Sequence, residues 1–66
     1  MLISQIQGIL LEAVEGGGEQ ALWNIARNNS ELAEVAREVL ELVTSPHFEV
    51  SLEEAIVIVT KNYNNE

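Results

Sequence analysis

The stretch that decides the fold is ELAEVAREVLELVT, residues 31–44. Its apolar side chains recur at three- and four-residue steps, which predicts an amphipathic helix. At 100° per residue they cover about half of the helix circumference. So wide an apolar face predicts a central helix that contacts several others. The apolar positions are Leu32, Val35, Ala36, Val39, Leu40, Leu42 and Val43.

The opposite face of this helix is acidic. Ser30 directly precedes the helix and can act as its N-cap, and Pro46 follows it and prevents its continuation. Side chains of one charge on the face away from the core predict a solvated surface, with weak mutual repulsion between neighbouring carboxylates. The acidic face consists of Glu31, Glu34, Glu38 and Glu41.

Two shorter helical segments precede residue 31, over 2–15 and 19–28. The first places Ile3, Ile6, Leu10 and Ala13 on one face, and this apolar face is flanked by Leu2, Ile9 and Val14. Gly16-Gly17-Gly18 separates the two segments, because glycine takes left-handed backbone conformations that end helices. We expect Asn28-Asn29 to end the second segment in the same way.

A fourth helix is predicted over 52–62, with an apolar face of Leu52, Ala55, Ile56 and Val59 to which Tyr63 would add. Ser51-Leu52-Glu53-Glu54 has the pattern of a capping box, in which the serine hydroxyl accepts from the backbone of the fourth residue. The following run, residues 55–60, is rich in β-branched residues and is also compatible with a strand. Helix is favoured by the capping box and by the lack of any sheet that a strand could join.

Together these segments predict an all-α fold, a single domain over 1–66 built as a small bundle of about four short helices. A chain of 66 residues buries only about 60% of its unfolded surface, so its core is marginal. The chain has no cysteine, which excludes disulfides as the remedy. We therefore expect dimerisation to complete the bundle.

The chain is strongly acidic, with eleven acidic and three basic residues and a formal net charge of −8. This charge repels nucleic-acid phosphates and anionic membranes, so direct binding to either is not expected. It suits a basic protein partner. The N-terminal residues lack a basic signal-peptide segment, and no apolar run approaches the roughly 20 residues of a membrane span. These features predict a cytoplasmic protein.

Catalytic and metal-binding patterns are weak. His47 is the only histidine and lies in a short connection, and no Glu-x-x-His pair of the di-metal bundles occurs. Gly16-Gly17-Gly18 lacks the Lys-Ser/Thr of a nucleotide loop. We expect no enzymatic activity, no cofactor and no metal site.

Apolar residues outside the predicted buried faces are the strongest functional signal. Leu11, Trp23, Val57 and Ile58 are expected to form a surface patch for binding. They predict a small acidic helical protein-interaction module, a regulator, adaptor or inhibitor, acting as a homodimer on another protein. The alternative is an acidic mimic of nucleic acid that inhibits a basic nucleic-acid-binding protein through Glu31, Glu34, Glu38 and Glu41.

Overall fold

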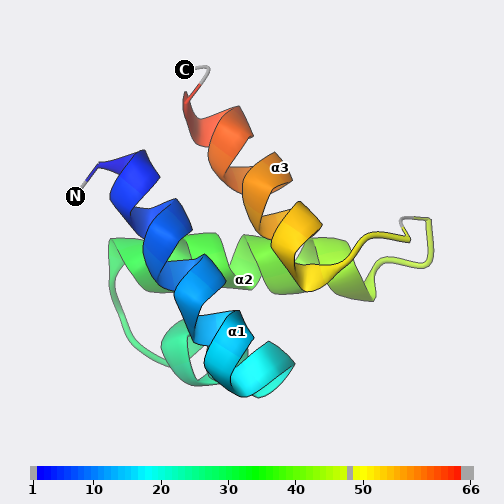
Figure 1. Cartoon of the computed structure of the whole chain (residues 1–66), viewed down its shortest axis with the longest axis horizontal. Coiled ribbons are helices and arrows are strands. Elements are labelled where there is room, and N and C mark those ends of the chain that lie inside the picture. The colour runs from blue at the N-terminus through cyan, green and yellow to red at the C-terminus, as the bar shows by residue number, and fades with distance from the viewer. Residues whose placement is uncertain (1, 48, 65–66) are drawn as a thin grey trace.

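Three α-helices make up the fold, and the all-α class predicted from the sequence is confirmed. The computed structural model describes residues 2–47 and 49–64, and no strand occurs within them. The helices are α1 (Ile3–Ala26), α2 (Glu31–Thr44) and α3 (Leu52–Asn64). Each helix contacts the other two, and α1 and α3 run antiparallel to each other while both cross α2 (Figure 1).

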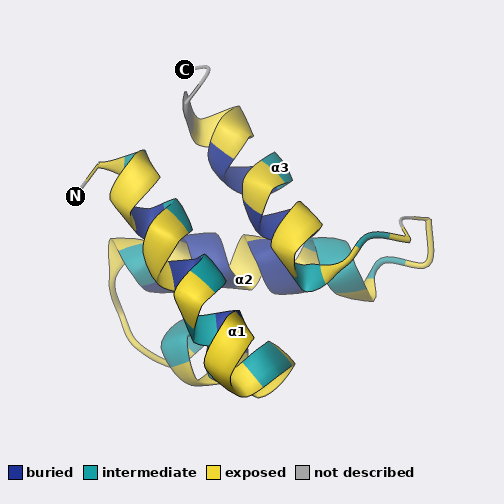
Figure 2. Ribbon diagram, in the orientation of Figure 1, coloured by how far each residue is buried: buried dark blue, intermediate teal, exposed yellow. Residues whose placement is uncertain are grey.

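The core lies where the three helices meet, and α2 contributes most to it. All three helices are buried where they face one another, and α2 carries five of the twelve buried apolar residues of the described chain, more than either of the other helices (Figure 2). This confirms residues 31–44 as the central helix, with the bounds that its periodicity predicts. The buried apolar residues are Ile6, Leu10, Val14, Leu22, Ala33, Val35, Ala36, Val39, Leu40, Ala55, Ile56 and Val59.

The two helical segments predicted before residue 31 are joined in one element, and the predicted break between them appears as a kink. Residues 3–26 form one element, α1, which is kinked at Gly18 (φ 62°, ψ −150°). Gly16 and Gly17 keep helical geometry, and Gly18 alone takes a backbone conformation that is essentially restricted to glycine. Helical geometry resumes after Gly18, so this glycine separates two helical segments of α1 that meet at the kink.

The expected end of α1 at Asn28-Asn29 is wrong. The helix ends at Ala26, its C-cap Arg27 stays in the right-handed region, and no described residue other than glycine has a positive φ. Arg37 of α2 takes over the capping. Its guanidinium donates to the carbonyl oxygens of Ala26 at 3.2 Å and Asn28 at 3.1 Å, and a cation there also complements the helix dipole.

The buried face of α1 is rotated from the predicted one. Leu2 and Ile9 were expected on the buried face and are exposed, whereas Leu11 was expected to point away from the core and is half-buried against it. At 100° per residue the difference is a rotation of roughly 40°. Its cause is that α1 packs against two helices, α2 and α3, so its buried arc faces the space between them.

Residues 52–64 are helical, which resolves the strand alternative for 55–60. The Ser51 hydroxyl accepts from the Glu54 backbone N–H at 3.2 Å, as the capping box predicts. Thr60, the β-branched polar residue of the run, is buried and donates its hydroxyl proton to the Ile56 carbonyl at 2.7 Å. The helix therefore accommodates its only buried hydroxyl within its own backbone.

Candidate interaction surface

Three of the four predicted interaction residues line grooves between helices. Trp23 lies in a groove between α1 and α2, Val57 in one between α1 and α3, and Ile58 in one between α2 and α3. Each groove belongs to a different pair of helices, because the three side chains leave their helices in different directions. Leu11 lines none of these three and packs against the core.

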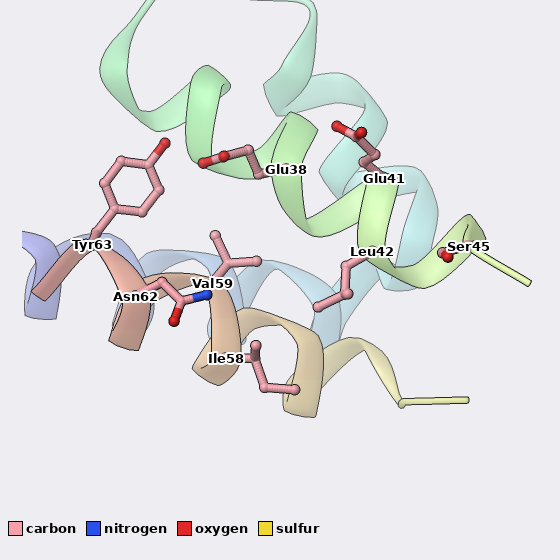
Figure 3. Close-up of a pocket in the computed structure, with 8 residues that line it drawn as sticks. All are labelled: Glu38, Glu41, Leu42, Ser45, Ile58, Val59, Asn62 and Tyr63. Atoms are coloured by element: carbon pink, nitrogen blue, oxygen red, sulfur yellow. The ribbon is translucent and has the colours of Figure 1, made fainter. Parts of the chain in front are cut away.

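The groove between α2 and α3 has the most distinctive chemistry. It has a volume of about 350 Å³. Its floor is apolar, and Glu38 and Glu41 lie on its α2 rim. Tyr63 stands at one end with its hydroxyl directed toward Glu38, whereas the carboxylate of Glu41 points away from α3 (Figure 3). We call it the acidic groove. Its lining residues are Glu38, Glu41, Leu42, Ser45, Ile58, Val59, Asn62 and Tyr63.

The residues of the acidic groove are brought together by spacing on two helices. On α2, Glu38, Glu41 and Ser45 follow at three- and four-residue steps, so they form one edge. On α3, Ile58 and Asn62 are four residues apart and form the other. The residues of each edge follow from helical spacing in the sequence, but the two edges face each other only because α2 and α3 cross.

All four glutamates of the predicted acidic face are exposed on α2. Glu38 and Glu41 border the acidic groove, and Glu41 also borders the groove of Trp23. Two apolar grooves therefore flank the acidic face. The groove of Val57 shares none of its residues with these two and carries Lys61 at its edge.

Tyr63 and Leu42 are the functional candidates that sequence reasoning did not select. Both were assigned to the apolar faces of their helices. Tyr63 is instead exposed and Leu42 is half-buried, and both line the acidic groove. Tyr63 lies in the last turn of α3, where a helix extends past its neighbours. That position was the signal in the sequence that could have identified Tyr63 as exposed.

The potential metal ligands of the described chain are His47 and the glutamates. His47 is exposed in the turn after α2. Within residues 2–47 and 49–64, no three histidine or acidic side chains are close enough together to hold a metal ion. None of the helices in the described chain has the length and apolar character required to cross a membrane.

No protein-family model matches this chain, and no curated protein or solved structure shows significant similarity to it. The function must therefore be argued from the residues of the chain itself.

Proposed function

We propose that this protein is a small acidic interaction module that binds a positively charged segment of another protein in the acidic groove, and that it acts as a homodimer. The observation that carries the proposal is the chemistry of that groove. An open apolar floor beside Ile58 and Val59 is bordered by two acidic residues, Glu38 and Glu41. Such a site fits a segment that offers an apolar anchor next to a lysine or arginine.

The size of the groove supports anchoring side chains as its occupants. Its volume of about 350 Å³ lies at the small end of the range for ligand sites. An exposed tyrosine at the edge of an apolar groove is typical of protein interfaces, because the ring buries a large area and the hydroxyl stays hydrated. Tyr63 holds that position.

The charge of the whole chain supports a cationic partner. The formal net charge of −8 belongs to a domain only 30 × 26 × 20 Å in extent. A field of this sign accelerates encounter with basic proteins and disfavours acidic ones. The rim carboxylates then fix the register of the bound segment.

Mimicry of nucleic acid is the second candidate, and the exposed acidic face of α2 favours it. Glu31 and Glu41 are ten residues apart, about 15 Å along a helix. Duplex DNA carries one charge per about 1.7 Å, or about nine over that length, against four on α2. Because the protein is so much less densely charged, a basic protein segment with an apolar anchor is the better match.

The proposal can be tested with a defined probe, a short synthetic peptide of alternating lysine and leucine. We expect it to bind the full chain and to shift the NMR signals of Ile58 and Tyr63. Glu38→Gln with Glu41→Gln should weaken binding about tenfold, because two exposed charge pairs contribute about 1.4 kcal/mol together. Raising the salt concentration should weaken it further.

The matched control is Glu53→Gln with Glu54→Gln, which removes the same charge from exposed positions outside the acidic groove. We expect it to weaken binding by less than about twofold, since distant exposed charges are largely screened. Equal losses in both double variants would mean that the peptide responds to net charge alone, and the groove proposal would fail. A natural partner that DNA displaces competitively would favour mimicry.

A further inference from the structure

Gly8 occupies a position in α1 that no contact within the chain explains. It lies in the interior of the N-terminal part of α1, is exposed, and a Cβ added to it meets no atom within 4 Å. Glycine destabilises an exposed helix interior relative to every residue except proline. Gly18, in contrast, is required by its backbone conformation. Gly16 is equally free of contacts but lies two residues from the kink at Gly18, whereas Gly8 lies far from it.

The missing side chain of Gly8 leaves a hollow on the outer surface of α1. Gln5, Gly8, Ile9 and Glu12 line it. These positions have the spacing i, i+3, i+4, i+7, which is the four-residue hole that receives one side chain of a neighbouring helix in knobs-into-holes packing. Ile9, at the edge of this hollow, is an apolar side chain exposed on the surface. One helix thus presents a knob and a hole side by side.

We infer that α1 pairs with α1 of a second copy, antiparallel about a two-fold axis, with Ile9 of each copy over Gly8 of the other. A two-fold contact requires a surface that complements itself, and an adjacent knob and hole meet that requirement. The pairing specifies the homodimer of the proposed function. It uses none of the residues of the acidic groove.

The polar groups on this face are complementary in the same register. An antiparallel pairing centred on Gly8 and Ile9 places Gln5 at the level of the partner's Glu12. The Gln5 carbonyl oxygen accepts from the Leu2 backbone N–H at 3.3 Å, so its amide nitrogen can donate to a carboxylate. We call this contact between the two α1 helices the seam. At both of its ends, the Glu12 carboxylate of one copy can accept from the Gln5 amide of the other.

The N-terminus of α1 adds a second complementary feature. Its N-cap, Leu2, makes no side-chain cap, and its first turn has no acidic residue, whereas α2 and α3 begin with acidic first turns. The antiparallel register brings Glu12 and Glu15 of one copy beside the first turn of the other. Negative charge at a helix N-terminus is stabilising, so each copy supplies what the other lacks.

Sedimentation equilibrium on the full chain tests the pairing. A single-helix seam between two acidic copies predicts a weak dimer, with a dissociation constant on the order of 0.1 mM. High salt should strengthen it, because screening reduces the repulsion between copies. Salt therefore acts on the dimer and on peptide binding in opposite directions.

Ile9→Gln removes the knob and should weaken the dimer at least tenfold. The matched control is Val57→Gln, since Val57 is an aliphatic residue of similar exposure (41% against 39% for Ile9) in the groove between α1 and α3. We expect Val57→Gln to leave the dissociation constant unchanged. Loss of the dimer with Val57→Gln but not with Ile9→Gln would overturn the seam while leaving a homodimer in place.

Gly8→Gln fills the hole, so it should stabilise the monomer and weaken the dimer. It should raise the melting temperature of the dilute monomer by about 2–5 °C, because glutamine is the better helix former. It should also weaken the dimer at least tenfold. A dimer that Gly8→Gln leaves intact, or a wild-type chain that stays monomeric at 1 mM in low and high salt, would overturn the seam without affecting peptide binding.

Discussion

Helices α1 and α2 differ in how they are stabilised. Helix α2 has its own N-cap, since the Ser30 hydroxyl accepts from the Ala33 N–H at 3.2 Å, and two acidic residues in its first turn. Helix α1 begins at Leu2 without a side-chain cap, contains four glycines and ends on carbonyls that Arg37 of α2 caps. Local sequence specifies α2, whereas packing and a neighbouring helix maintain α1.

The difference shows where each helix was predictable. A helix with an internal cap and a regular apolar period forms the same element in any fold that can bury its apolar face. A helix with weak propensity, whose C-terminal carbonyls are capped from another helix, takes its end from that neighbour. Paired substitutions, two pairs within α1 and one that compares the starts of α1 and α2, separate these two sources of stability.

The largest effect is expected from Leu10→Ala in α1. Leu10 is 0% exposed at the centre of the core, and truncating a buried leucine costs about 2–5 kcal/mol. A domain of this size has rarely more than about 5 kcal/mol of stability, so much of the protein should unfold. Leu2→Ala, at a side chain 69% exposed, should change the free energy of unfolding by less than about 0.5 kcal/mol. Urea unfolding followed by circular dichroism measures both, and similar losses would show that α1 is not held by packing.

An effect of intermediate size is expected at the kink. Gly18→Ala places a Cβ in a conformation restricted to glycine and should cost about 1–3 kcal/mol. Gly16→Ala lies two residues away in helical geometry, with nothing within 4 Å of the new Cβ, and should add up to about 1 kcal/mol. The same urea experiment distinguishes them. A stabilising Gly18→Ala would mean that α1 can straighten.

The smallest effect is expected at the helix starts. Ser30→Ala removes the cap of α2 and should cost about 1 kcal/mol. Leu2→Ser introduces a cap at α1 and should add up to about 1 kcal/mol, since the N–H groups of its first turn lack a side-chain acceptor from the N-cap. Thermal unfolding at low protein concentration provides the measurement. No gain from Leu2→Ser would indicate that solvent already satisfies these groups.

The sequence predicted the helix elements well where the signals were local. The bounds of α2, the caps at Ser30 and Ser51, and the helical state of 52–62 follow from periodicity and capping patterns. Three elements replace the four predicted helices, because the first two predicted segments meet at the kink of Gly18 within α1. Asn28-Asn29 was not needed as a stop, because Arg37 reached the end of α1 from another helix.

The candidate site was predictable only in part. The exposure of Trp23 and Val57 and the acidic face of α2 were anticipated. The arrangement of the apolar side chains was not anticipated, because Trp23, Val57 and Ile58 lie in grooves made by three different helix pairs. Leu11 was misplaced for the same reason that the buried face of α1 was rotated: one helix packing against two others buries the arc between them.

The sequence by itself determined the helical class, the position of the central helix and the acidic surface, because periodicity, capping and charge act over one or two turns. Only the tertiary structure decided the kinked course of α1, its buried face and the meeting of Glu38 and Glu41 with Ile58 and Tyr63. These features depend on how helices distant in the sequence cross, and crossing is set by the packing of all three at once.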